Sequence, residues 1–221
     1  MKNQAVIFDL DNTLLDRKSS LQTFANKLFD KYIDKGFSKE QLFQELLEAD
    51  GDGYRGKEEV YAELLYKLPW ENTPSYEEFI DFWNIEFPNS SELMGGALEV
   101  LGQFKSHGYK LGIITNGKSK VQNRKIDSVH IRDYFDSILI SEEVGCKKPN
   151  KEIFDLSIKE LKVDPTKSFF IGDHPLNDVF GAANAGINAI WLEGCSDWDD
   201  SIQIKKYQVV KKLEDILCII P

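Results

Sequence analysis

The segment Ala5–Leu15, AVIFDLDNTLL, combines a run of apolar, β-favouring residues with two aspartates two positions apart. A short apolar run of this kind is typical of a buried central strand in a sheet that helices cover on both faces. Asp9 and Asp11 follow at the end of the strand, where open α/β sheets bind their ligands, and in an extended backbone their side chains point the same way. Because neighbouring carboxylates repel each other, the pair predicts a shared cation or proton, although two solvated acids at a strand end also fit the pattern.

The composition of the chain excludes some classes of partner. Its 221 residues suffice for one substantial core, or for a core with a smaller insertion, and 42% of them are hydrophobic and 29% charged. The formal net charge of −10 argues against a nucleic-acid polymer or an anionic membrane as the main partner, but it leaves room for a small phosphorylated substrate. No apolar stretch approaches the ~20 residues of a transmembrane helix.

The cysteines and the first residues bear on the cellular compartment. Cys146, Cys195 and Cys218 are odd in number and lack metal-ligand spacing, so we expect neither a disulfide framework nor a zinc site, and a reducing cytoplasm fits best. Met1–Gln4 lead directly into the first strand, which predicts that no signal peptide is present.

After Leu15 the apolar residues follow helical spacing over residues 16–94. The pattern predicts four successive amphipathic helices, of which the second begins at Ser38 and the fourth at Ser75, each with a capping-box residue three positions further on. The glycine-rich segment Asp50–Gly56 predicts a loop between the second and the third helix. With no strand between them, these helices can pack against one another as a small bundle.

From residue 95 onward the predicted helices and strands alternate. Helices are expected near 97–106, 118–128, 150–161 and 178–185, and strands at 110–115, 137–140, 168–172, 188–191 and 207–210. This order implies right-handed βαβ units and a parallel sheet. We therefore expect an α/β protein with a doubly wound parallel sheet formed by residues 1–15 and 95–221, and with an inserted α-helical domain of residues 16–94.

Polar groups follow four of the predicted strands, and the carboxyl ends of parallel strands share one edge of a sheet. These groups are Asp9 with Asp11, Thr115–Gly117, Lys147–Asn150 and Gly172–Asp178. Carboxylates can hold a hard divalent cation, while a hydroxyl, backbone amides and an ammonium can surround a phosphate. Each segment alone has a simpler explanation, as a tight turn, a solvated lysine or a helix cap, but all four in chain order favour a common site.

The four segments resemble the signature motifs of the haloacid dehalogenase-like hydrolase superfamily. The matching residues are Phe8–Leu14 (FDLDNTL), Ile114–Gly117 (ITNG), Lys148–Pro149, and Ile171–Asp173 with Asp178. The resemblance spans the whole chain. It implies a Rossmann-like core, a helical cap inserted after the first motif and, as in most members, magnesium-dependent hydrolysis of a phosphate ester.

The resemblance also implies a role for each site residue. Asp9 would attack phosphorus and form an aspartyl-phosphate, and Asp11 would protonate the departing alkoxide and then activate water. Thr115 and the backbone amides near Asn116 would hold the phosphoryl oxygens. Lys148 would offset the charge of these oxygens and of Asp9.

The same motifs imply a Mg²⁺ site. The ion would be bound by the carboxylates of Asp9 and Asp173 and by the backbone carbonyl of Asp11, with Asp178 placed behind these ligands or acting through water. The substrate would be a small phosphorylated metabolite, such as a nucleotide, a sugar phosphate or a phosphoglycolate-like ester. Both a monomer and a homodimer are compatible with the sequence.

Three other functions stay open. A haloacid dehalogenase needs no magnesium and lacks the second aspartate, so Asp11 argues against this activity. A sugar-phosphate mutase keeps both aspartates, and product analysis would separate it from a hydrolase. A non-catalytic sensor of a phosphorylated metabolite would keep the pocket without turnover.

The cap is expected to select the substrate, because the core groups recognise only a phosphoryl group and a metal. In the Gly51–Gly56 loop of the cap, Tyr54 offers a stacking face and Arg55 a bidentate clamp for an anion. A solvent-exposed connector is the simpler alternative for this loop.

Overall fold

The computed structural model describes residues 3–204 and 207–221. The chain forms two compact units, one made of Met1–Asp16 with Leu93–Pro221 and the other of Arg17–Glu92. The first unit contains a sheet and has an apolar cluster on each side of it, whereas the second unit is helical and has one apolar cluster of its own. In the described ranges, no helix combines the length and the apolar character that crossing a membrane requires.

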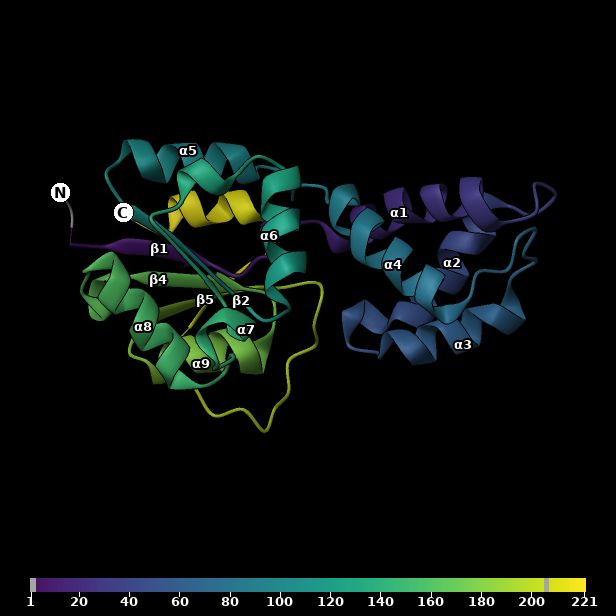
Figure 1. Ribbon diagram of the computed structural model, residues 1–221. Helices are drawn as coiled ribbons and strands as arrows, with labels where there is room; N and C mark the ends of the chain where they lie inside the picture. The colour runs from purple at the N-terminus through teal and green to yellow at the C-terminus, as the bar shows by residue number, and fades with distance from the viewer. Residues whose placement is uncertain (1–2, 205–206) are drawn as a thin grey trace. The chain divides into compact units, whose positions relative to one another are not determined.

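In the described part of the chain, six parallel strands form one sheet in the order β3-β2-β1-β4-β5-β6 (Figure 1). Their bounds are β1 Ala5–Phe8, β2 Lys110–Thr115, β3 Ser137–Ile140, β4 Phe169–Gly172, β5 Asn188–Leu192 and β6 Gln208–Val210. The central position of β1 agrees with its sequence, because all of its residues are apolar and fully buried. The doubly wound parallel sheet predicted from the sequence is confirmed.

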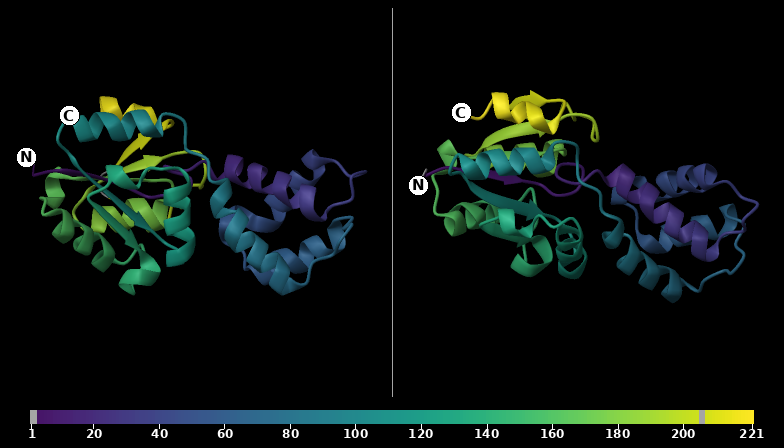
Figure 2. Two further views of the ribbon diagram at one scale, coloured as in Figure 1. Left: turned by 45° about the horizontal axis from the view of Figure 1, so that its top comes forward. Right: turned by 90° about the horizontal axis from the view of Figure 1, so that it is seen from above.

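Helices cover both faces of the sheet. They are α5 Ala97–Ser106, α6 Ser119–Ser128, α7 Ser141–Val144, α8 Lys151–Leu161 and α9 Gly181–Asn184. Because successive side chains of a strand point to opposite faces, Val6 and Phe8 of β1 pack in the cluster that contains α5, and Ala5 and Ile7 pack in the cluster that contains α8. The views in Figures 1 and 2 agree, with α5 on one side of the sheet and α8 and α9 on the other.

Two parts of this unit differ from the prediction. The helix expected near 178–185 is instead a π-helical turn, Pro175–Phe180, followed by the short α9. Neither α7 nor the 3₁₀ helix Leu213–Cys218 is among the predicted helices, because segments of this length show too few turns for a helical period to stand out.

The second unit contains the four predicted helices, α1 Arg17–Tyr32, α2 Lys39–Asp50, α3 Lys57–Lys67 and α4 Tyr76–Glu86. Ser75 begins α4 with the predicted capping box, and the Ser38 side chain accepts a hydrogen bond from the Gln41 backbone at the start of α2. The loop predicted at Asp50–Gly56 is correct only in part. Asp50 ends α2, and Gly51–Gly53 form a 3₁₀ turn, because Gly51 takes the left-handed conformation that closes a helix.

Candidate active site

The carboxyl ends of β1 and β4 lie side by side and bring two motif segments together. The Asp9 N–H donates to the Ile171 carbonyl at 2.9 Å, which extends the pairing of these strands by one residue. Asp9 and Asp173 therefore follow adjacent strands, and both are buried. Ser196 donates to the Asp173 carboxylate at 3.3 Å, and the Trp191 indole donates to the Asp173 carbonyl at 2.8 Å.

A third carboxylate joins this pair. The carboxylate oxygens of Asp9, Asp173 and Asp178 lie within 4.8 Å of one another, and all three residues are buried. The turn after β4 positions Asp178, because the His174 backbone N–H donates to its carboxylate at 3.0 Å. Gly172 is needed at the strand end, since a Cβ there would lie 2.4 Å from the Asp178 side chain.

Lys148 is the cation of this cluster. Its Nζ lies 2.5 Å from Asp9 Oδ1 and 2.6 Å from Asp178 Oδ1, and its side chain is 3% exposed. Burial alone would lower the pKa of Lys148, but the charges of Asp178 and Asp9 raise this pKa above its usual range. The ammonium is therefore charged at neutral pH.

The pKa values of two carboxyl groups are raised. Burial raises the pKa of Asp9 from 3.8 to about 7, against the opposing charge of Lys148. Burial and then the negative charges of Asp178 and Asp9 raise the pKa of Asp173 from 3.8 to about 8. The positive charge of Lys148 is therefore insufficient to stabilise the ionised forms of all the carboxyl groups in the site.

A divalent cation fits this deficit. Three carboxylates and one ammonium leave two negative charges uncompensated when all groups are ionised. Carboxylate oxygens are also the ligands that Mg²⁺ and Ca²⁺ prefer. The predicted metal residues Asp9, Asp173 and Asp178 thus meet at one point, and Asp178 contacts Lys148 directly, which the sequence analysis did not anticipate.

Asn116 supports Lys148 with its side chain. Its Nδ2 donates to the Lys148 carbonyl at 3.0 Å, and its Oδ1 accepts from the Lys148 N–H at 2.9 Å. These bonds connect the end of β2 to the loop that carries the lysine. The Asn116 side chain is therefore bonded to the Lys148 backbone. The role predicted near Asn116 belongs to backbone amides, so these side-chain bonds leave it a prediction.

Thr115 and Asp11 are joined by residues that the sequence analysis missed. Gln122 Nε2 donates to Thr115 Oγ1 at 2.7 Å and to Asp11 Oδ2 at 3.0 Å, and Lys125 Nζ donates to both carboxylate oxygens of Asp11 at 2.7 and 2.8 Å. Both residues lie on α6 and are buried. Their spacing of three on the helix after Thr115 was the available signal, because it places two polar side chains on one face.

Arg55 belongs to the helical unit. Its Nη1 lies 2.6 Å from Glu63 Oε2 and its Nε 3.8 Å from Glu59 Oε2, and these acids raise the pKa of its guanidinium. The neighbouring Tyr54 is exposed. In this conformation the guanidinium is engaged by carboxylates of its own unit.

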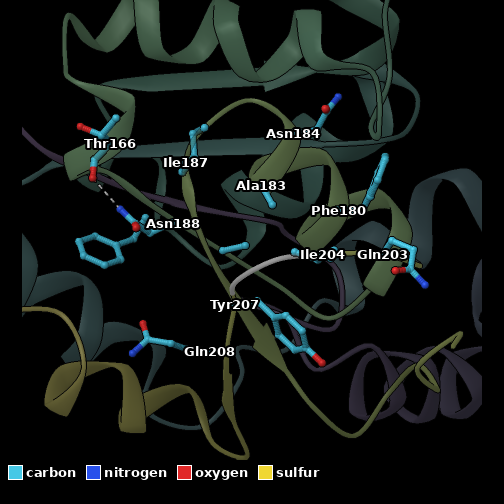
Figure 3. A pocket seen from close by; sticks show the side chains of 13 residues that line it. Thr166, Phe180, Ala183, Asn184, Ile187, Asn188, Gln203, Ile204, Tyr207 and Gln208 are labelled. Carbon is cyan, nitrogen blue, oxygen red and sulfur yellow. Dashed lines mark hydrogen bonds between the residues drawn. The ribbon is translucent and has the colours of Figure 1, made fainter. Parts of the chain in front are cut away.

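A separate cavity lies at the opposite edge of the sheet, where β4, β5 and β6 begin (Figure 3). It has a volume of about 640 Å³, and its lining includes Thr166, Asn188 and Tyr207. The Asn188 side chain donates to the Thr166 carbonyl at 2.9 Å. None of the predicted site residues lines this cavity.

A known protein family matches most of the chain. The model of the haloacid dehalogenase-like hydrolase family matches residues 6–192. The chain therefore belongs to this family and is a hydrolase, as its resemblance implied.

Individual relatives and structures are also similar. The glyceraldehyde 3-phosphate phosphatase of Pyrococcus abyssi is 30% identical over 194 residues, which cover 86% of this chain and 81% of that protein. The pyrimidine 5'-nucleotidase YjjG of Escherichia coli is 41% identical over 98 residues, which cover 44% of this chain and 43% of that protein. The crystal structure of a phosphatase of the same family from Thermococcus onnurineus has a TM-score of 0.63 at 25% identity, with 99% of this chain and 97% of that chain covered.

Proposed function

We propose that the protein is a magnesium-dependent phosphatase that hydrolyses a small phosphate monoester through an aspartyl-phosphate. The observation that carries this proposal is the buried contact of Lys148 with both Asp9 and Asp178, beside Asp173. A nucleophilic carboxylate, a fixed ammonium and an acidic cation site within a few ångströms are what phosphoryl transfer to an aspartate requires.

In the first step, a carboxylate oxygen of Asp9 attacks phosphorus while the bond from phosphorus to the ester oxygen breaks. Asp11 gives its proton to the departing alkoxide, so that an alcohol leaves. Lys148 offsets negative charge on the phosphoryl group, and the Thr115 hydroxyl donates to a phosphoryl oxygen.

In the second step, Asp11 acts as a base. It takes a proton from a water molecule, the water oxygen attacks phosphorus, and the bond from phosphorus to Asp9 breaks. The products are inorganic phosphate and the free Asp9 carboxylate, and Asp11 is protonated again for the next turnover.

The residues that would hold Mg²⁺ are Asp9, Asp173 and the backbone carbonyl of Asp11, with Asp178 next to them. When bound, the cation would neutralise carboxylate and phosphoryl charge and orient the phosphoryl group. The two uncompensated charges of the acidic cluster support this assignment.

The substrate class is a small phosphorylated metabolite. The names of the relatives support this class, since one acts on a triose phosphate and another on a nucleotide. Residues 16–94 are proposed to be the cap that selects among such esters, with Arg55 as a candidate contact. An Arg55→Ala protein should then have a raised KM for the preferred ester and an unchanged KM for p-nitrophenyl phosphate.

The proposal is tested with the purified protein and a panel of triose phosphates, nucleotides, sugar phosphates and phosphoglycolate. Release of inorganic phosphate with Mg²⁺, and its loss with a chelator, is the expected result. Formation of an isomeric phosphate ester would instead indicate a mutase. No turnover of any ester would indicate a non-catalytic protein, and full activity in chelator would refute the metal requirement.

A further inference from the structure

Helix α6 contributes two buried polar residues to the site, one turn apart. Gln122 is 2% exposed and Lys125 is 4% exposed, and both contact Asp11. We propose that Gln122 and Lys125 are positioning residues for phosphoryl transfer, Gln122 by directing the Thr115 hydroxyl and Lys125 by holding the Asp11 carboxylate. This inference rests on the proposed phosphatase function.

The orientation of the Gln122 amide follows from its partners. In its ionised state, facing the Lys125 ammonium, the Asp11 carboxylate offers only acceptors, so the amide presents its NH₂ group to it. The same NH₂ group donates its second hydrogen to Thr115 Oγ1 at 2.7 Å. The Thr115 oxygen therefore accepts from Gln122, and the hydrogen of its hydroxyl is left for another acceptor.

This arrangement selects the direction in which Thr115 donates. A hydroxyl has one hydrogen that rotates to suit its neighbours, and a fixed donor on the oxygen turns this hydrogen away from Gln122. Gly117 leaves room for the Gln122 side chain in this position, since a Cβ at Gly117 would lie 2.9 Å from Gln122 Cγ. A phosphoryl oxygen is the acceptor that the proposed reaction brings to Thr115.

Lys125 restrains the carboxylate of Asp11. Its ammonium contacts both oxygens of Asp11, while the Asp11 side chain itself keeps 27% of its surface exposed. The Asp11 carboxylate is thus bound by Lys125, while part of its surface stays accessible to solvent. After Asp11 has given its proton to the leaving group, the ammonium also compensates the carboxylate charge that this transfer creates.

The two residues make different kinetic predictions. Lys125→Met should leave the first step with p-nitrophenyl phosphate fast, because nitrophenolate leaves without a proton, and should slow hydrolysis of the intermediate. We expect a burst of nitrophenolate, and a kcat lowered about 100-fold with a KM that falls in parallel, so that kcat/KM stays nearly unchanged. Gln122→Met should instead weaken inhibition by inorganic phosphate about tenfold, because the Thr115 hydrogen is no longer directed.

The experiment measures rapid-mixing kinetics and thermal unfolding of both variants, with Lys125→Arg as the rescue and Lys120→Met as the control. Lys120 lies exposed on the same helix, so its change should have no effect on either step. Lys125→Arg should remove the burst and restore most of kcat. If Lys125→Met does not fold, Lys125→Gln is measured in its place, and we expect the same burst and the same lowered kcat.

Inactivity of the unmodified protein would refute the proposed function. If the unmodified protein is active but Lys125→Met shows no burst, or if both steps slow equally in Lys125→Met, the role of Lys125 is overturned. Unchanged phosphate inhibition in Gln122→Met would overturn that of Gln122.

Discussion

The side chain of Asn116 makes two hydrogen bonds to the backbone of Lys148, one to its carbonyl and one from its N–H. Asn116 follows β2, and Lys148 lies in the loop between α7 and α8. The lysine that contacts Asp9 and Asp178 is therefore anchored to the sheet from both its side chain and its backbone. An asparagine suits this position because its amide can donate and accept at the same time.

We predict that Asn116→Ala lowers kcat/KM by about tenfold, because loss of the two bonds frees the Lys148 loop and leaves its backbone groups partly unsatisfied. The loss should be smaller than that of Lys148→Ala. The measurement is steady-state turnover of p-nitrophenyl phosphate, with the exposed Asn184→Ala as the control. Equal activity of Asn116→Ala and Asn184→Ala would refute the anchoring role.

Removing the lysine itself should have a larger effect. Lys148→Ala leaves Asp9 and Asp178 buried without their ammonium, which should cost on the order of 2–5 kcal/mol in kcat/KM. Lys148→Arg should restore only part of the activity, since a planar guanidinium cannot replace a point charge between two acids. Undiminished turnover of Lys148→Ala would exclude its role in the reaction.

Cation binding should stabilise the protein more at higher pH. The pKa values of Asp9 and Asp173 are raised to about 7 and 8, so the folded state holds protons that the unfolded state has lost above pH 3.8. Stability without metal therefore falls as the pH rises through this window, and a cation on the ionised carboxylates offsets the loss. At a concentration 100 times its dissociation constant at pH 8, Mg²⁺ should add about 2.7 kcal/mol at pH 8, and the same concentration should add close to nothing at pH 5.

The matched variant for this prediction is Asp173→Asn, measured by thermal unfolding with Mg²⁺ or chelator from pH 5 to 8. In chelator at pH 8 it should be at least as stable as the unmodified protein, because one buried charge is gone. It should also lose the stabilisation by Mg²⁺, whereas the exposed Asp133→Asn should keep it. A Mg²⁺ effect that is independent of pH, or intact in Asp173→Asn, would contradict the assigned site.

The helical unit contains a buried ion cluster whose pH dependence has the opposite sign. Asp50 is 1% exposed and lies 2.6 Å from Arg17 and 2.5 Å from Lys57. Burial alone would raise the pKa of Asp50, but Arg17 and Lys57 lower it below its usual 3.8. The cluster therefore contributes stability above pH 3.8, and this contribution is lost as the pH falls through the lowered pKa.

Asp50→Asn should destabilise the helical unit by about 3 kcal/mol at pH 7, and the difference should shrink below pH 4. Hydrogen exchange of peptides from residues 17–92 measures this unit separately from the sheet. The control is Asp30→Asn, whose exposed pair with Lys39 should be worth at most about 1 kcal/mol. An equally small effect of Asp50→Asn would show that the cluster does not stabilise the unit.

Local sequence patterns were sufficient to predict most of the fold. The strand predicted at 110–115 and the helix predicted at 97–106 have the observed bounds, because apolar periodicity and terminal glycines act within a few residues. In the turn after β4, His174 Nδ1 accepts hydrogen bonds from the backbone N–H groups of Leu176 and Asn177, so this side chain shapes the turn.

Contacts between distant residues could not be predicted in the same way. Lys125 and Asp11 are 114 positions apart, and nothing in a single sequence specifies that α6 turns this lysine toward β1. The Asn116 side chain could equally have faced a phosphate or a backbone, and only the position of the Lys148 loop decides between them. The sequence motifs therefore indicated which residues gather, but not which of them hold the others in place.

The proposed reaction depends on phosphorylation of Asp9, which can be measured by trapping the intermediate. Asp11→Asn should slow hydrolysis of the aspartyl-phosphate, so it is mixed with p-nitrophenyl phosphate and Mg²⁺, quenched in acid and mapped by peptide mass spectrometry. We expect one phosphoryl group per protein, located on Asp9 and absent from the Asp9→Asn protein. A phosphoryl group on another residue, or turnover without any phosphorylated protein, would contradict the proposed reaction.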